Sequence, residues 1–187
     1  MSQFPILETE RLILRQLKQD DAREVFQYFS LDEVTKFYDL ESFTTINQAE
    51  ALIGRWNQKF EENQGFRWGI TLKSDHRVIG TCGFHGWMKK HSKAEIGYEL
   101  TPEYWRKGIM TEANQKIIEF GFNELRLNRI EAFVEPENLS SRKVLEKKGF
   151  CEEGVLKEHY FWGNRFVDVV IYALLKKDYL NDICNLG

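Results

Sequence analysis

The spacing of hydrophobic residues changes in the middle of residues 94–125, and the rest of the chain can be arranged around this stretch. Ile96 and Leu100 belong to an alternation of apolar and polar residues, which predicts a strand with one buried face. From Met110 onward the apolar residues recur every three or four positions, which predicts a helix. The connection between them, residues 105–109, is basic and contains a glycine.

The same two patterns predict the other elements of the chain. Alternation predicts further strands at residues 9–17, 66–72, 78–87, 129–134, 151–162 and 166–175. Helical spacing behind capping residues predicts helices that begin near Asp20 or Asp21, near Thr44 or Thr45, and at Asn138. A helix separates the strands at 94–100 and 129–134, so these two are expected to be parallel neighbours. The expected fold is therefore one α/β domain, with a mixed seven-stranded sheet and four helices.

The connection at residues 105–109 is suited to binding phosphate. The N–H groups in the first turn of a helix lack partners and carry the positive end of the helix dipole. Gly108 allows a ligand to approach the main chain closely, and Arg106 and Lys107 add positive charge. The alternative is a tight turn with two solvated cations. The sequence contains no G-x-x-x-x-G-K-[ST] motif and no G-x-G-x-x-G motif after a strand.

Length and composition restrict the classes of protein that remain. The 187 residues suit a single domain, residues 1–187, with a core at about 6–180. A net charge of −3 argues against a nucleic-acid partner. No apolar run approaches the ~20 residues of a membrane span, so we expect a cytoplasmic protein. Cys82, Cys151 and Cys184 are widely spaced, which favours reduced thiols and no metal site.

Residues 129–150, RIEAFVEPENLSSRKVLEKKGF, resemble the GNAT family of N-acetyltransferases. More narrowly, the chain resembles the ribosomal-protein-alanine acetyltransferase (RimJ/RimL-like) branch, from residues 9–12, TERL, to the last strand. In this family the amides of a loop written [QR]-x-x-G-x-[GA] hold the diphosphate of acetyl-CoA. Gly108 matches the glycine of that loop, whereas Trp105 and Met110 depart from its first and last positions.

The resemblance implies that acetyl-CoA is the cofactor and that two groups of residues hold it. The strands at 94–100 and 129–134 are expected to splay near Glu99 and Leu100, which leaves main-chain groups free to hold the pantetheine arm. The remaining cofactor-binding residues implied by the resemblance lie in the loop and at the start of the next short helix: Arg106, Lys107, Gly108, Ile109, Met110, Thr111, Asn138 and Ser141.

The reaction implied by the resemblance is direct transfer of acetyl to a primary amine. The amine must be neutral to attack, and a carboxylate can accept its proton directly or through water. Glu95 is the favoured base, with Glu99 and Glu158 as further candidates. Many family members protonate the departing thiolate with a tyrosine, and Leu145 stands at that place. The pattern N-x-x-S of the ribosomal-protein branch assigns this role to Ser141.

The sequence leaves the acceptor open between a protein N-terminal α-amine and a small amine such as a polyamine, amino-acid derivative or antibiotic. A protein acceptor predicts an open acidic groove near Asp32, Glu33, Asp39 and Glu41, whereas a small acceptor predicts a closed pocket walled by aromatic residues. We expect acetyl-CoA and the amine as partners of a monomer or homodimer. A non-catalytic acyl-CoA-binding module is the rival from another functional class.

Overall fold

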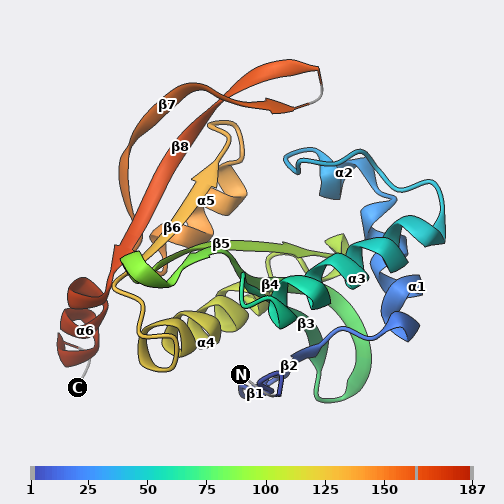
Figure 1. Ribbon diagram of the computed structural model, residues 1–187, viewed down its shortest axis with the longest axis horizontal. Coiled ribbons are helices and arrows are strands. Elements are labelled where there is room, and N and C mark those ends of the chain that lie inside the picture. Colours follow the sequence, from blue (N-terminus) through green and yellow to red (C-terminus); the bar gives the residue numbers. More distant parts are fainter. Residues whose placement is uncertain (1–2, 163, 186–187) are drawn as a thin grey trace.

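A computed structural model describes residues 3–162 and 164–185, with side chains to residue 181, and shows an α/β fold around one mixed sheet (Figure 1). The sheet has eight strands in the order β1-β2-β3-β4-β5-β6-β8-β7. Their bounds are Leu7–Glu8, Leu12–Gln16, Phe66–Leu72, Asp75–Met88, Lys93–Leu100, Arg129–Val134, Cys151–Trp162 and Arg165–Leu175 for β1 to β8. All neighbouring strands are antiparallel except β5 and β6.

Six α-helices accompany the sheet in the described residues. Their bounds are Ala22–Phe29, Asp32–Thr35, Ile46–Glu61, Ile109–Asn123, Leu139–Glu146 and Lys176–Asn185 for α1 to α6. Short 3₁₀ helices occur at Gln19–Asp21, Lys89–His91 and Pro102–Tyr104. The predicted fold class is confirmed, whereas the predicted numbers of strands and helices were too low.

The extra elements are short or lie at an end of the chain. The two-residue strand β1 pairs with β2 through the register Leu7↔Leu14, so the residues before the predicted first strand fold back on it. The single turn α2 has four residues, which are too few to show a helical repeat in the sequence. The helix α6 follows β8 directly, in a stretch where no element is predicted from the sequence.

Two hydrophobic clusters lie on opposite faces of the sheet because successive side chains of a strand point to opposite sides. On one face Phe66, Trp68 and Ile70 of β3 pack with α4. On the other face Leu17 and Val78 pack with α1 and α3. The central strands are therefore covered on both sides, which fixes the position of the helices relative to the strand ends.

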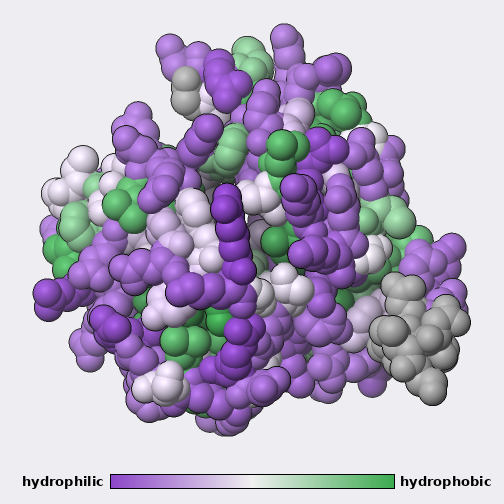
Figure 2. All heavy atoms as spheres, turned by 180° about the vertical axis from the view of Figure 1, so that it is seen from behind, coloured by the Kyte–Doolittle hydropathy of each residue, from purple (hydrophilic) through white to green (hydrophobic). Residues whose placement is uncertain are grey.

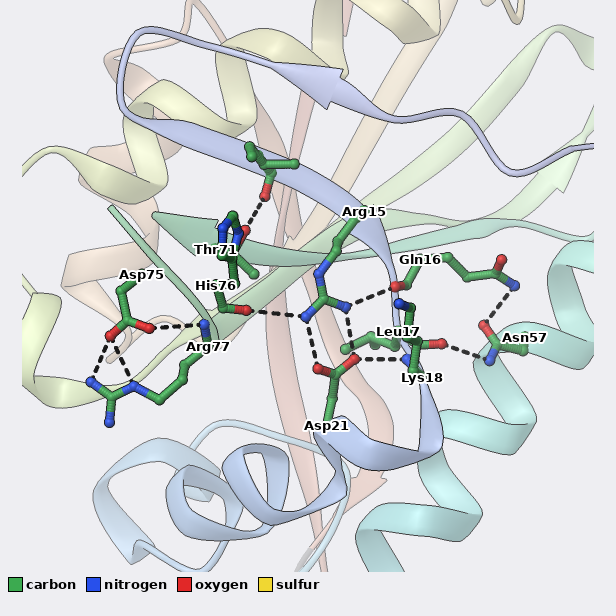
Figure 3. A network of polar contacts seen from close by, with 11 residues as sticks. Arg15, Gln16, Leu17, Lys18, Asp21, Asn57, Thr71, Asp75, His76 and Arg77 are labelled. Atoms are coloured by element: carbon green, nitrogen blue, oxygen red, sulfur yellow. Dashed lines mark hydrogen bonds and ion pairs between the residues drawn. The ribbon is translucent and has the colours of Figure 1, made fainter. Parts of the chain in front are cut away.

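Polar contacts fasten α1 and α3 to β2 (Figure 3). Arg15 donates to both carboxylate oxygens of Asp21 at 2.8 Å, and the N–H of Lys18 donates to the same carboxylate at 2.7 Å. From α3, Asn57 Nδ2 donates to the carbonyl of Leu17 at 3.0 Å. These contacts hold α3, which lines the main cavity of the protein, beside the sheet.

The parallel pair β5 and β6 stays together over a short distance only. Its register is Lys93↔Arg129, Ala94↔Ile130 and Glu95↔Glu131, and no pairing between the two strands follows in the described residues. Meanwhile β6 continues to pair with β8 as far as Val134. The strands therefore separate as the family resemblance implied, but the separation begins just after Glu95, earlier than Glu99 and Leu100.

The outer surface is mainly hydrophilic on the face seen from behind (Figure 2). Hydrophobic side chains on this face form several small groups and do not merge into one band. Among the described residues no helix is both long and apolar enough to cross a membrane.

Candidate active site

The turn before α4 presents unpaired N–H groups, as its glycine and helical start predicted. Gly108 is the N-cap of α4 and has a φ of 76°, a left-handed conformation that glycine adopts without strain. The first backbone bond of this turn runs from Glu112 N to Gly108 O at 3.0 Å. In the described part of the chain, the backbone N–H groups of residues 106–111 have no hydrogen-bond acceptor. These amides and the positive end of the α4 dipole are therefore available to an anion.

Side chains in this turn divide into two kinds. Arg106 and Lys107 are exposed, so their charges lie at the surface of the turn. Ile109 and Met110 are 3% and 8% exposed and pack into the core, so they offer a ligand their main chain only. The bulky Met110 thus does not occupy the space beside the amides, which explains how it can stand at a position where a small residue was expected.

A clamp from the N-terminal segment holds the turn in place. Arg11 donates from Nη1 to the carbonyl of Lys107 at 3.1 Å and from Nε to Glu112 at 2.6 Å. Thr9 and the N–H of Arg11 donate to the other oxygen of Glu112. Burial works against ionisation of Glu112, but these donors and the Arg11 charge lower the pKa of its carboxyl. Sequence reasoning missed this clamp because about a hundred residues separate its two sides and no local pattern links them.

The Glu99 side chain is surrounded by polar side chains from other elements. It is buried and accepts hydrogen bonds from Arg67, Thr81, Tyr38 and Tyr28. Burial lowers the pKa of Arg67, but the Glu99 carboxylate more than compensates and raises it. The Glu99 carboxylate is therefore committed to a buried ion pair and is not available as a base.

The side chain of Leu100 points away from the cavity into the core. The carbonyl of Leu100 accepts from Trp105 Nε1 at 2.7 Å. Neither Leu100 nor Glu99 lines the main cavity, so any contact of these two residues with acetyl-CoA must come from main-chain atoms. The indole of Trp105, at the Gln/Arg position of the family loop, instead ties the turn to the end of β5.

A cavity of about 610 Å³ opens where β5 and β6 separate. Gly97 and Tyr98 of β5 form one side of it, and Ala132, Phe133 and Val134 of β6 form the other. No residue of the turn at 106–111 lines this cavity. The free amides and the cavity are thus two neighbouring parts of one region around β5 and the start of α4, as an elongated ligand requires.

Ser141 lies in the cavity wall with an unexpected neighbour. Its hydroxyl is 2.9 Å from the hydroxyl of Tyr98, whose oxygen also lies within 3.3 Å of the Ser141 carbonyl. Burial raises the pKa of Tyr98, so this phenol stays protonated at neutral pH. Asn138 caps α5 by accepting from Ser141 N at 3.2 Å, and it also lines the cavity. Of these contacts, sequence reasoning anticipated the cap and missed Tyr98.

Glu95 lines the same cavity beside His85. The two side chains approach to 3.1 Å between His85 Nε2 and Glu95 Oε2, and 29% of the Glu95 side chain is exposed. By contrast Glu158 is exposed on β7, outside the lining, and its N–H donates to Asp168. Glu95 is therefore the predicted carboxylate that combines access to the cavity with a hydrogen-bonding neighbour.

Besides Tyr98, aromatic residues make up a large part of the cavity wall. They come from the segment after α2, from α3, from β3 and β4, and from β6 and β7: Phe37, Tyr38, Trp56, Phe66, Phe84, Phe133, Tyr160 and Trp162. Among the residues with described side chains, no group of His, Cys, Asp and Glu is arranged to hold a metal ion. Cys82 is buried, Cys151 is exposed, and the side chain of Cys184 lies outside the described residues.

Comparison with known proteins decides the family. The acetyltransferase (GNAT) domain family matches residues 11–151. The chain belongs to the GNAT family. It is an N-acetyltransferase that depends on acetyl-CoA, as the resemblance of the sequence implied. The unpaired amides at Gly108 and the separated strands fit this cofactor, because they offer donors for a diphosphate and a gap for an extended arm.

Individual relatives cover nearly the whole chain. The uncharacterized N-acetyltransferase YoaA of Bacillus subtilis (strain 168) is 44% identical over 173 residues, which is 92% of this chain and 98% of the relative. The crystal structure of a GNAT-family acetyltransferase from Bacillus anthracis is 30% identical, with a TM-score of 0.83 over 92% of this chain and 99% of that one.

Two other similar proteins have names that state an acceptor, and the acceptors differ. The structure of a ribosomal-protein-S5-alanine acetyltransferase from Vibrio fischeri is 26% identical, with a TM-score of 0.81 over 94% of this chain and 98% of that one. The spermidine N(1)-acetyltransferase of Vibrio cholerae is 26% identical over 171 residues, 91% of this chain and 96% of the relative.

Proposed function

We propose that the enzyme transfers acetyl directly to a primary amine in the cavity between β5, β6 and α3, without a covalent enzyme intermediate. When bound, acetyl-CoA supplies an activated acetyl thioester. The observation that carries the assignment is the coincidence of free amides at residues 106–111 with a gap that begins at Glu95 and Glu131. We assign the diphosphate to these amides, with Arg106 and Lys107 adding positive charge, and the pantetheine arm to the main chain of β5 and to Asn138.

Glu95 is the proposed base for the incoming amine. An amine attacks only when neutral, and an α-amino group with a pKa of ~7.7–8.0 loses its proton more readily than a lysine at ~10.4. Glu95 can accept this proton directly or through a water molecule. The contact between His85 and Glu95 supports the assignment, because a ring nitrogen at 3.1 Å can orient the carboxylate.

Ser141 is the proposed donor to the departing thiolate. Its place in the cavity wall and the contact with the protonated Tyr98 support this role, because Tyr98 can donate to Ser141 while Ser141 donates into the cavity. Leu145, at the position of the tyrosine found in many family members, is 1% exposed and belongs to the core.

The residues that line the cavity favour a small amine over a folded protein surface. Asp32, Glu33 and Glu41 do not line the cavity, and only Asp39 of the four predicted groove residues does. The aromatic walls match the pocket predicted for a small acceptor. A protein N-terminal α-amine is the second candidate, supported by the similarity to the ribosomal-protein-S5-alanine acetyltransferase. A RimJ/RimL-like function, a cytoplasmic location and a monomeric or homodimeric state stay predictions of the sequence.

Release of free thiol from acetyl-CoA, measured across a panel of amines, tests the proposal. We expect amine-dependent release in the parent protein and a loss of about 10²-fold in turnover for Glu95→Gln, the scale of a lost acid or base. Glu158→Gln is the matched control and should keep the parent rate. Tight cofactor binding without release for any amine would favour the non-catalytic acyl-CoA-binding module instead.

A further inference from the structure

One face of α3 forms a wall of the cavity. Leu52, Arg55, Trp56 and Lys59 all line it, and their spacing of i, i+3, i+4 and i+7 places them on one side of a helix. Leu52 is buried and Trp56 half-buried, whereas Arg55 and Lys59 are exposed to the cavity and to solvent. The wall therefore has an apolar base and two positive charges one helical turn apart.

These two charges are not neutralised by the rest of the protein. Among the residues whose side chains are described, neither Arg55 nor Lys59 forms an ion pair or a side-chain hydrogen bond. The third cationic side chain in the lining, Arg67, is paired with Glu99 below the cavity surface. Because the turn at 106–111 does not line this cavity, the two free cations are separate from the amides assigned to the diphosphate.

The lining of the cavity also includes the carboxylates of Glu95 and Asp39, besides Tyr160 of β7. Burial, and then these two carboxylates, raise the pKa of Tyr160. The Tyr160 ring stacks on Trp162 with the ring centroids 4.7 Å apart. Carboxylates beside aromatic faces attract an ammonium group. The cavity thus offers one region for a positive amine and another, on α3, for a negative group.

We propose that the acceptor carries an anionic group, a carboxylate or a phosphate, in addition to its amine, and that Arg55 and Lys59 bind this group. The inference rests on the proposed function, since it assigns the amine to the region of Glu95. A polyamine fits this cavity poorly, because its second ammonium meets two unpaired cations at α3. A zwitterionic acceptor satisfies both regions at once, which gives specificity through attraction and through rejection of the wrong charge.

Matched acceptors that differ only in the anionic group test the proposal. One pair is the amidated dipeptides Ser-Asp and Ser-Asn, and the other is O-phosphoethanolamine and ethanolamine. Their affinities for the protein with coenzyme A bound are measured by calorimetry, and thiol release is measured in parallel with acetyl-CoA. We expect at least one anionic member to bind about tenfold more tightly than its neutral partner, the size of a charge-assisted hydrogen bond. A preference within the dipeptide pair indicates a carboxylate as the anionic group, and a preference within the ethanolamine pair indicates a phosphate.

Substitutions on α3 and α1 test whether Arg55 and Lys59 cause the preference for the anionic acceptor. The double variant Arg55→Gln, Lys59→Gln should bring the ratio of affinities for the anionic and the neutral acceptor close to one. Binding of the neutral acceptor with the parent affinity would show that the double variant is folded. Arg23→Gln, an exposed arginine on α1 outside the cavity, is the matched control and should keep the ratio.

Three results would overturn the inference: equal affinities within both pairs, no binding of either anionic acceptor at millimolar concentration, or a preference that survives the double variant. Absence of thiol release with the binding preference intact would count against the proposed function alone.

Discussion

The pair Tyr98 and Ser141 gives the sharpest prediction about the chemistry. Ser141→Ala removes the proposed donor to the thiolate and should lower turnover by about 10²-fold with little change in cofactor affinity. Tyr98→Phe removes only the phenol that contacts the Ser141 hydroxyl at 2.9 Å. A neutral hydrogen bond contributes about 1 kcal/mol, so this variant should lose roughly fivefold in turnover.

A double-mutant cycle separates direct from indirect action. If Tyr98 acts by orienting or relaying a proton to Ser141, the phenol has nothing to act on once the serine is gone. The double variant should then turn over about as fast as Ser141→Ala alone, and the two effects should not multiply. Thiol release is measured at saturating acetyl-CoA and amine, with calorimetry for coenzyme A affinity and a thermal melt for stability.

The outcomes are distinct. Unaltered turnover in Ser141→Ala would remove this serine from the mechanism. Effects that multiply would show that Tyr98 acts on the reaction independently of Ser141. A loss of turnover that comes with an equal loss of coenzyme A affinity would mean that the variants disturb the site as a whole and not the departing thiolate.

Three further predictions concern the framework of the site. Glu99→Gln leaves Arg67 buried without its partner and should lower the free energy of unfolding by about 3–5 kcal/mol in a urea titration; a loss under about 1 kcal/mol would contradict the buried pairing. Arg11→Gln frees the carbonyl of Lys107 and should weaken coenzyme A binding about fivefold by calorimetry, with turnover at saturation retained, whereas unchanged affinity would show that the turn needs no clamp. Burial works against ionisation of Glu131, but its basic neighbours lower the pKa of its carboxyl. Glu131→Gln should therefore cost about 2 kcal/mol at pH 7, and the difference from the parent should shrink below about pH 4, as the carboxylate is protonated in the parent; a difference that does not change with pH would refute this origin.

Sequence reasoning succeeded where the physical cause is local. The alternation around Ile96 and the glycine at 108 depend on neighbouring residues only, so the strand, the turn and the helix start could all be predicted. The capping role of Asn138 was predictable for the same reason, because the side chain accepts from an N–H three residues later.

Prediction from the sequence failed where the role of a residue depends on a contact with a residue distant in the chain. Glu95 and Glu99 lie on the same face of β5, and nothing local tells them apart. In the fold one lies beside His85 in the cavity, and the other is enclosed with Arg67 of β3. Likewise the positive wall of α3 shows in the sequence only as two cations on an amphipathic helix, a pattern typical of a solvated face.

The gap between β5 and β6 poses a structural problem, because a sheet that opens in its middle loses ladder hydrogen bonds there. An ionic cluster lies at the closed end, where the strands still pair: Glu131 accepts from Lys93 at 2.9 Å and from Arg129 at 2.6 Å, and Arg129 also pairs with Glu153 of β7.

At the open end, Trp105 and Arg11 fix the turn before α4 to β5 and to the N-terminal segment. Side chains thus hold both strands together at the closed end and fix the β5 side at the open end, while β6 stays paired with β8. The main-chain groups along the gap are left for the ligand. A cofactor that binds as an added strand needs this arrangement, because a complete ladder would close the site and an unsupported gap would collapse.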